Sequence, residues 1–405
     1  MGEWRNGRRW GLKIPSPHGG EGSTPSSPIR NSYEQSELDF LIPSLTGLPI
    51  GRSVTEELNN HAYLMKPKVY LTRKILPEGI DLLKKQDYHL VINPLDKPVS
   101  RKELIHQIKD TNGILCTLSD RIDSEIIDAG LRLKVISNYA VGYDNIDVNY
   151  ATKKDIVITN TPGVLTEATA EVTWALIFGC ARRVTEADRY VRQGKFKVWG
   201  PTLLLGRLIT GKTLGIIGCG RIGQSVGLKA RAFGMKILYF NRSRKPSFER
   251  QTSAKRVSLR TLLKESDFVT LHLPLTKETK HFIGTNELRM MKSSAYFINV
   301  ARGPIVDESA LADALHRKII AGAGLDVYEN EPSVHPELIK LDNVVLLPHL
   351  GSATVETRTK MAIIAAENLI AALEGKKPRF IANPFPPKAD LPKAQSCEKK
   401  TASDK

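Results

Sequence analysis

The sequence has few cysteines, no long hydrophobic run and no dense block of basic residues. Its four cysteines, Cys116, Cys180, Cys219 and Cys397, are widely spaced and form no Cys-x-x-Cys pair, which argues against a zinc site and a disulfide scaffold. We therefore expect a reducing, cytoplasmic location and no metal. No apolar run reaches the roughly 18 residues that a membrane span needs, so no membrane association is expected.

The net charge of +16 at pH 7 raises the question of nucleic-acid binding. The Lys and Arg residues are dispersed along segments that also carry Glu and Asp, and the final stretch EKKTASDK is mixed in charge. We therefore predict no nucleic-acid partner. A positive potential also favours the binding of anionic cofactors and acids.

The chain of 405 residues is long enough for two domains, but residues 1–64 differ from the rest. Their stretch IPSPHGGEGSTPSSPI is rich in Gly, Pro and Ser and predicts disorder. A transit peptide is an alternative, because three Arg residues lie near the start. A third interpretation is that Met65 is the true start and that a gene-calling artefact precedes it, since GSTPSS resembles a translated transfer-RNA T-arm. Residues 387–405 are expected to form a flexible tail.

From Met65 onward, short apolar stretches alternate with helical segments. The first series contains KVYLT, PEGIDLLKKQ, ELIHQIKD, GILCTL, SEIIDAG, KVISNYA and IVITN. The second contains TLGIIG, DFVTLHLP, AYFINV, ESALADALHRK, IAGAGLDV and NVVLLP. Such alternation favours parallel sheets covered by helices on both faces. We therefore predict an α/β protein with two lobes.

A long apolar segment, residues 161–194, separates the two series. Its Glu and Ala residues favour a helix, and Thr166 can cap it. The apolar content is high for one surface helix, so the segment is either a buried linker helix or a subunit contact.

The stretch GCGRIG places Gly218, Gly220 and Gly223 in G-x-G-x-x-G spacing, after an apolar strand and before a helix. Gly218 allows the tight turn, Gly220 lets the backbone approach a pyrophosphate, and Gly223 lets the helix pack on the strand. The helix N-terminus would offer its N–H groups to the phosphates. The alternative is a glycine turn that serves helix packing alone.

The second strand of this unit ends in Asn241, Arg242 and Ser243, where an NAD site usually places an acidic residue for the ribose 2′-OH. No carboxylate there repels a 2′-phosphate, Arg242 can pair with it, and the other two side chains can donate hydrogen bonds. We therefore predict NADP(H) in preference to NAD(H). The alternative is that Arg242 stacks on the adenine of NAD.

Arg302, Glu331 and His349 each follow an apolar strand, and ligands of open α/β sheets bind beyond such strand ends. Taken singly, they could be a surface ion-pair partner, a helix cap and a satisfied core histidine. Together they suit the reduction of a 2-keto acid. Arg302 offers a planar fork to the carboxylate and keto oxygen. His349 can give and take a proton, and Glu331 would fix its tautomer and stabilise the imidazolium.

GCGRIG, NVARGPIVDESAL, GLDVYENEP and LPHLGSAT resemble motifs of the D-isomer-specific 2-hydroxyacid dehydrogenase family. SNYAVGYDNIDV and the NRS turn resemble its glyoxylate/hydroxypyruvate reductase branch. The resemblance extends from Met65 to about Pro386, and the family's catalytic Arg, Glu and His fall on Arg302, Glu331 and His349.

The resemblance implies that the backbone of Val141 and Gly142 contacts the substrate and that Asp326 faces the nicotinamide carboxamide. Glu329, the third carboxylate of GLDVYENEP, is expected to face solvent. The resemblance further implies cofactor contacts from four segments, which comprise Cys219, Gly220, Arg221 and Ile222; Asn241, Arg242 and Ser243; Val300, Ala301 and Arg302; and His349, Leu350 and Gly351.

The family architecture implies two doubly wound parallel-sheet lobes. A Rossmann cofactor domain, residues 164–347, would be inserted in a flavodoxin-like substrate domain of residues 65–163 and 348–386. Closure of the cleft between them would exclude water, and the long helical segment would pair across a homodimer. The chain departs from the branch at Leu203, where members often carry a second aromatic after Trp199, so no substrate-wall role is carried over to that position.

These features favour an NADPH-dependent reductase of glyoxylate or hydroxypyruvate, whose small-molecule partners are a 2-keto acid and its D-2-hydroxy acid. A phosphoglycerate-type dehydrogenase and a broader 2-keto acid reductase are alternatives. The short stretch after Pro386 leaves no room for an appended regulatory domain, which disfavours the first of these. A dinucleotide-sensing, corepressor-like binding module is an alternative of another class, but the sequence shows no partner-peptide groove.

Overall fold

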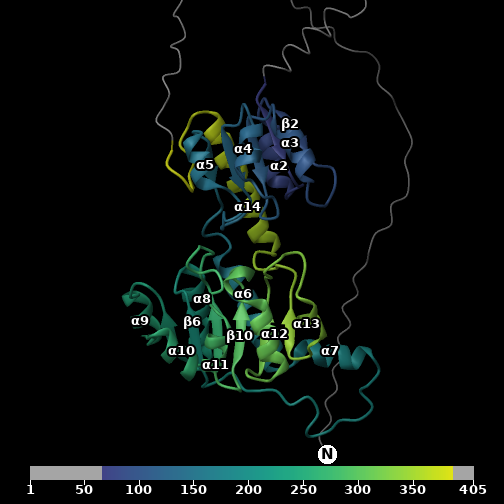
Figure 1. Cartoon of the computed structure of the whole chain (residues 1–405), viewed down its shortest axis with the longest axis vertical. Coiled ribbons are helices and arrows are strands. Elements are labelled where there is room, and N and C mark those ends of the chain that lie inside the picture. Colours follow the sequence, from purple (N-terminus) through teal and green to yellow (C-terminus); the bar gives the residue numbers. More distant parts are fainter. Residues whose placement is uncertain (1–65, 386–405) are drawn as a thin grey trace, which may run out of the picture. The chain divides into compact units, whose positions relative to one another are not determined.

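The computed structural model describes residues 66–385 (Figure 1). The predictions made for residues 1–64, for a start at Met65 and for residues 387–405 lie outside this described part. Within it are two parallel sheets, one of five strands in the order β2-β1-β3-β4-β5 and one of seven in the order β12-β11-β10-β9-β6-β7-β8. The predicted α/β fold with two parallel-sheet lobes is confirmed.

The five-stranded sheet comes from the first series of apolar stretches, and its neighbouring strands are all parallel. Its central strands are buried along their whole length, as expected for a sheet covered on both faces. The strands are β1 (Lys68–Leu71), β2 (His89–Ile92), β3 (Gly113–Cys116), β4 (Val135–Asn138) and β5 (Val157–Thr159). The helices between them are α2 (Pro77–Lys84), α3 (Arg101–Ile108), α4 (Ser124–Ala129) and α5 (Val148–Lys153).

A helix from the far end of the chain completes this lobe. α14 (Val355–Leu373) is the yellow-green helix among the purple and blue elements of Figure 1, and it packs on α2 and β4. Ser137 on β4 donates its Oγ–H to the carbonyl oxygen of Ala365 at 2.8 Å. A Cβ atom at Gly79 would lie 2.6 Å from the carbonyl oxygen of Ala362, so only glycine permits this close approach of α2 and α14.

The seven-stranded sheet comes from the second series and is also entirely parallel. Its strands are β6 (Thr213–Ile217), β7 (Lys236–Phe240), β8 (Lys255–Arg256), β9 (Phe268–Leu271), β10 (Tyr296–Asn299), β11 (Gly322–Leu325) and β12 (Val344–Leu346). Its helices are α8 (Arg221–Ala230), α9 (Pro246–Thr252), α10 (Leu259–Glu265), α11 (Thr285–Met290), α12 (Glu308–His316) and α13 (Pro336–Lys340), with 3-10 turns at η2 (Arg231–Phe233) and η3 (Gly303–Ile305).

The direction in which strands are added to this sheet reverses at β6, which lies between β7 and β9. β7 and β8 extend the sheet on one side of β6, and β9 to β12 extend it on the other. Ligands of open α/β sheets bind beyond the carboxyl ends of the strands at such a switch point. The glycine motif follows β6 and therefore lies at the expected place.

The long segment between the sheets is two helices, so the prediction of one continuous helix is wrong. α6 (Thr166–Ala181) and α7 (Val184–Arg192) are separated by Arg182 and Arg183, and the backbone of Arg183 has a left-handed φ of 54°. α6 packs on α8, β10 and β11 and is largely buried, whereas no residue of α7 is buried. Thr166 is the first residue of α6 and does not cap it. No helix among residues 66–385 is both long and apolar enough to span a bilayer.

Candidate active site

The glycine motif forms a tight turn between β6 and α8. Gly218 has a φ of +93°, and a Cβ atom there would lie 2.5 Å from the carbonyl oxygen of His272. A Cβ atom at Gly223 would lie 2.3 Å from the carbonyl oxygen of Gly218. Gly220 is the N-cap residue of α8, and a Cβ atom there would meet nothing within 4 Å. Packing thus requires Gly218 and Gly223, while Gly220 borders open space in front of the helix N-terminus, where an anion is favoured.

The turn after β7 is tied to this glycine motif. The backbone N–H of Cys219 donates to Oδ1 of Asn241 at 3.2 Å, and Nδ2 of Asn241 donates to the carbonyl oxygen of Ser243 at 2.9 Å. The Asn241 amide is therefore used within the turn. Arg242 is exposed, and in the described part of the chain its side chain forms no hydrogen bond or salt bridge. Its guanidinium is thus the group of this turn that is available to a phosphate.

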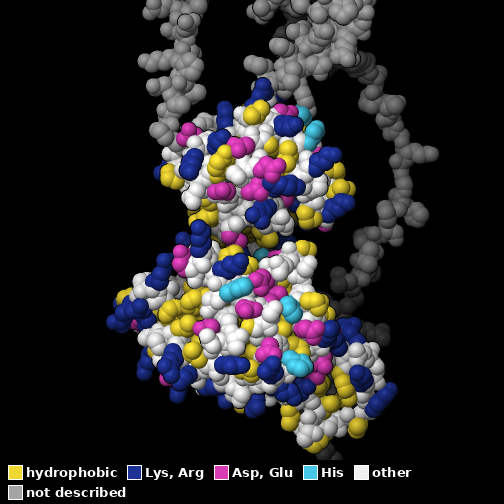
Figure 2. All heavy atoms as spheres, viewed as in Figure 1, with side chains coloured by type: hydrophobic (Ala, Val, Ile, Leu, Met, Phe, Trp, Pro, Cys, Tyr) yellow, Lys and Arg dark blue, Asp and Glu magenta, His cyan; other side chains and the backbone are white. Residues whose placement is uncertain are grey.

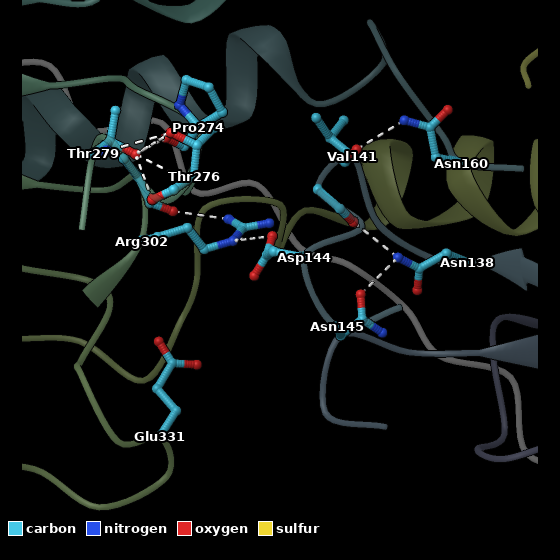
Figure 3. A network of polar contacts seen from close by, with 12 residues as sticks. Asn138, Val141, Asp144, Asn145, Asn160, Pro274, Thr276, Thr279, Arg302 and Glu331 are labelled. Atoms are coloured by element: carbon cyan, nitrogen blue, oxygen red, sulfur yellow. Dashed lines mark hydrogen bonds and ion pairs between the residues drawn. The ribbon is translucent and has the colours of Figure 1, made fainter. Parts of the chain in front are cut away.

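Arg302 follows β10 and is held by two acceptors (Figure 3). Its Nε–H donates to Oδ1 of Asp144 at 3.0 Å, and Nη1 donates to the carbonyl oxygen of Ala301 at 2.8 Å. The third nitrogen, Nη2, lies against Gly142, where a Cβ atom would approach it to 1.8 Å. Asp144 and Ala301 therefore orient the guanidinium so that Nη2 faces the Val141–Gly142 backbone.

The Val141–Gly142 backbone is held through its carbonyl groups. Nδ2 of Asn160 donates to the carbonyl oxygen of Val141, and Nδ2 of Asn138 donates to that of Gly142, each at 2.8 Å (Figure 3). The N–H groups of Val141 and Gly142 donate to no acceptor within residues 66–385. Two free N–H groups beside a guanidinium suit a small carboxylate.

Glu331 and His349 are in direct contact. Nδ1 of His349 and Oε2 of Glu331 lie 2.8 Å apart, and Oε1 of Glu331 accepts from the backbone N–H of Tyr328 at 3.0 Å. Burial raises the pKa of the Glu331 carboxyl. The hydrogen bond and positive charge of His349, the Tyr328 N–H and the charge of Arg302 outweigh burial and hold this pKa below its ordinary value. The carboxylate is therefore ionised beside the imidazole at neutral pH.

The turn that carries His349 is held by hydrogen bonds to Asp326. Asp326 is buried, and its carboxylate accepts from the backbone N–H groups of Leu350 at 2.6 Å and Gly351 at 2.8 Å. Its carbonyl oxygen accepts from the N–H of His349 at 2.9 Å. Burial raises the pKa of Asp326, and these hydrogen bonds offset part of the rise. Asp326 thus fixes the backbone from which the His349 imidazole extends.

Glu329 does not face solvent, so that expectation is wrong. Its Oε1 lies 2.5 Å from Nε2 of His281, and only 23% of its side chain is exposed. Its backbone N–H donates to the buried carboxylate of Glu308. The sequence offers no sign of this contact, because His281 lies 48 positions away.

One cavity of about 940 Å³ brings most of the predicted residues together. Its lining includes Val141, Gly142, Arg221, Ile222, Val300, Ala301, Arg302, Asp326, Glu331, His349 and Gly351. The remaining residues predicted to bind the cofactor do not line this cavity; they are Gly218, Cys219, Gly220, Gly223, Asn241, Arg242, Ser243 and Leu350. The three residues proposed for catalysis and the backbone proposed for substrate binding therefore share one space.

His272 also lines this cavity, and the sequence reasoning missed it. Both ring nitrogens are buried and without a hydrogen-bond partner in the described residues. Burial lowers the pKa of this imidazole to about 3, so the ring is neutral. A buried, unpartnered polar group requires an explanation, and a bound ligand would supply it. Its position directly after the apolar stretch DFVTL is a signal that could have identified it.

Comparisons with known proteins show which family this chain belongs to. Residues 174–351 match the family model described as D-isomer specific 2-hydroxyacid dehydrogenase, NAD binding domain. The chain is 50% identical over 323 residues to a glyoxylate reductase of Thermococcus kodakarensis, which covers 79% of this chain and 97% of the relative.

Two solved structures extend the comparison. The TT0316 protein from Thermus thermophilus is 43% identical with a TM-score of 0.73, covering 78% of this chain and 99% of that one. An NADPH-dependent glyoxylate/hydroxypyruvate reductase from Sinorhizobium meliloti, in complex with NADP and malonate, is 31% identical with a TM-score of 0.70, covering 79% and 98%.

Proposed function

This chain belongs to the D-isomer-specific 2-hydroxyacid dehydrogenase family, in its glyoxylate reductase branch, and from this premise we propose that it reduces glyoxylate and hydroxypyruvate with NADPH. The observation that carries the proposal is the Glu331–His349 hydrogen bond of 2.8 Å in the cavity that Arg302 also lines. A proton donor and a carboxylate clamp in one cavity suit the reduction of a small keto acid.

The substrate carboxylate is bound by Nη2 of Arg302 and by the N–H groups of Val141 and Gly142. These are charge-assisted hydrogen bonds, so they fix the keto group relative to the imidazole. Asp144 keeps the guanidinium in place through its bond to Nε. The nicotinamide, when bound, supplies the hydride that the keto carbon receives.

His349 protonates the keto oxygen from Nε2, since Nδ1 is engaged by Glu331. The ionised Glu331 stabilises the imidazolium before the transfer and fixes the ring. In the oxidation of a D-2-hydroxy acid, the same nitrogen takes the proton from the hydroxyl group. Asp326 supports this step by holding the backbone of the turn that carries His349.

The residues present suit a dinucleotide with a 2′-phosphate. Open space borders Gly220 at the N-terminus of α8, which would receive the pyrophosphate. The unpartnered nitrogens of His272 would bond a hydroxyl or phosphate group of the cofactor. Arg242 would pair with the 2′-phosphate, and no acidic residue stands in the Asn241–Ser243 turn to repel it.

We further propose a homodimer whose contact includes α7 and the segment that follows it. In this region of the surface, hydrophobic side chains lie beside Lys and Arg (Figure 2). Its exposed apolar residues are Val184, Val191, Phe196, Val198, Trp199, Leu205 and Leu208. An apolar surface of this extent favours association. A sedimentation velocity run that gives the mass of a monomer at all concentrations would refute it.

A cytoplasmic location is supported by the free, buried thiols of Cys116, Cys180 and Cys219.

The activity is tested by following NADPH or NADH oxidation with a panel of glyoxylate, hydroxypyruvate, pyruvate and 3-phosphohydroxypyruvate. We expect the highest kcat/KM with glyoxylate or hydroxypyruvate, and at least a roughly tenfold preference for NADPH. An NADH preference contradicts the cofactor assignment. No turnover with any acid, together with tight cofactor binding, points to a binding module.

A further inference from the structure

We propose that Arg256 is a positioning residue for dinucleotide selection, because it holds the backbone of the turn that presents Arg242 to the 2′-phosphate. The inference rests on the proposed NADPH preference and adds to it a residue outside the turn. Arg256 lies on β8, the two-residue edge strand of the seven-stranded sheet.

Arg256 donates hydrogen bonds to two consecutive carbonyl groups of the turn. Its Nε donates to the carbonyl oxygen of Asn241 and its Nη2 donates to that of Arg242, both at 3.0 Å. These two donors lie on one edge of the guanidinium, so the contact is a fork across adjacent peptide groups. The turn is thereby held from the side of β8, while the bond from Cys219 to Asn241 holds it from the glycine motif.

β8 places Arg256 in this position. Arg256 pairs with Tyr239 of β7 in parallel register, and the N–H of Val257 donates to the carbonyl oxygen of Tyr239 at 3.0 Å. Arg256 therefore stands beside the end of β7, close to where the turn begins. The short strand has no apolar residue, and both of its residues are exposed.

The neighbouring cation is already neutralised, which leaves Arg242 as the group that a phosphate meets. Arg244 donates to both carboxylate oxygens of Glu249, at 3.3 and 2.6 Å. Glu249 also accepts from the hydroxyl of Tyr239 at 2.5 Å. Arg242 has no such hydrogen-bonded partner in the described residues. The backbone of the turn therefore fixes the point from which the Arg242 side chain extends, and that backbone is what Arg256 holds.

A cavity of about 740 Å³ adjoins this arrangement, lined by Phe240, Arg244, Glu249 and residues 254–258. Its wall includes Arg256 and Lys255, so the charge near the turn is positive on the side of β8. Arg256 therefore adds a favourable potential for a dianionic phosphate while its donors are used on the carbonyl groups.

Arg256→Lys tests the role, because lysine keeps the charge but cannot donate to both carbonyl oxygens in a fork. Arg260→Lys is the matched control, since Arg260 on α10 is exposed and forms no hydrogen bond or salt bridge within residues 66–385. We expect Arg256→Lys to raise the KM for NADPH about tenfold and to change the KM for NADH and the kcat at saturation less than about twofold, on the scale of one charge-assisted hydrogen bond.

Calorimetric titration with 2′,5′-ADP and with 5′-AMP gives a readout independent of turnover. Arg256→Lys should weaken the binding of 2′,5′-ADP about tenfold and leave that of 5′-AMP unchanged. In an Arg242→Gln background it should have little further effect, because the turn then has no cation to position. Arg260→Lys should match the wild type throughout.

Three outcomes distinguish a failure of the proposed NADPH preference from a failure of the role proposed for Arg256. If the wild type prefers NADH or binds 2′,5′-ADP no better than 5′-AMP, both the cofactor proposal and the role of Arg256 fail. If the wild type prefers NADPH and Arg256→Lys retains the full preference, only the role of Arg256 fails. If KM rises equally for both cofactors, Arg256 merely supports the fold.

Discussion

Replacing Glu331 by Gln should move the pH dependence of catalysis while leaving the shape of the site intact. The amide has nearly the same size as the carboxylate, and its single oxygen can still accept from Nδ1 of His349, while its NH2 group faces the N–H of Tyr328 without accepting from it. The change therefore removes the negative charge and one acceptor. Because the protonated imidazole is the form that donates in reduction and the Glu331 carboxylate is the charge that it faces, the pH profile of reduction should respond to the loss of this charge.

The expected size follows from the contact itself. A hydrogen bond between charged partners contributes about 1.5–3 kcal/mol, and about 1.4 kcal/mol corresponds to one pH unit. The His349 and Glu331 side chains are 25% and 28% exposed, so solvent screening favours the lower end of this range. The descending limb of the pH profile for keto-acid reduction should therefore move down by about one unit.

The assay is kcat/KM for glyoxylate with saturating NADPH, measured from about pH 5 to 10 in buffers of constant ionic strength. Glu329→Gln is the matched control, since this carboxylate lies on the same segment but contacts His281 instead of His349. A Glu331→Gln profile that overlies the wild type, or an equal shift in Glu329→Gln, would refute the reasoning.

The same carboxylate links stability to pH. The pKa of Glu331 is lowered in the folded protein, so its ionised form stabilises the fold at pH values above the ordinary carboxyl pKa of 4.5. That contribution is lost as the pH falls through the lowered folded value. Urea unfolding should therefore show wild type more stable than Glu331→Gln at pH 7, with the difference shrinking below about pH 4.

Further substitutions test the other parts of the site. His349→Ala should lower kcat at least about 100-fold while NADPH binding, followed by fluorescence, is retained. Gly220→Ala should raise the KM for NADPH without loss of stability, because its Cβ enters open space. Gly223→Ala should instead cost about 1–3 kcal/mol in thermal unfolding, since its Cβ meets a backbone oxygen at 2.3 Å. Gly142→Ala should displace Arg302 and raise the KM for glyoxylate at unchanged KM for NADPH; equal changes in both would contradict the assigned contact.

The sequence predicts those parts of the fold that depend on local pattern. The buried strand β3 is a continuous apolar run, and the glycine motif follows its strand as required. β8 could not be predicted from the sequence, because neither Lys255 nor Arg256 is apolar. Their extended conformation depends on pairing with β7. The break at Arg183 could not be predicted either, since no glycine or proline marks it.

In the candidate site, the residue types and the pairing of Glu331 with His349 could be predicted, but the other partners could not. Arg302, Glu331 and His349 follow strands that end at one edge of one sheet, which is a local inference. The contact of Arg302 with Asp144 joins residues 158 positions apart, and only the folded chain reveals it. The position of His272 after an apolar strand could have marked it as a site residue, but its burial and its lack of a hydrogen-bond partner in the described residues are seen only in the folded chain.

The position of α14 has a consequence for how the protein is made. Ser137 and Ala365 are 228 residues apart, yet their hydrogen bond lies inside the five-stranded lobe. On the ribosome, the strands of this lobe emerge early, but the helix that covers them emerges only after the whole seven-stranded sheet. The lobe that is begun first is thus completed last, and the sheet face that α2 and α14 share is only partly covered for most of synthesis. We expect released chains truncated before residue 355 to hold a folded seven-stranded sheet and to depend on chaperones for the other lobe.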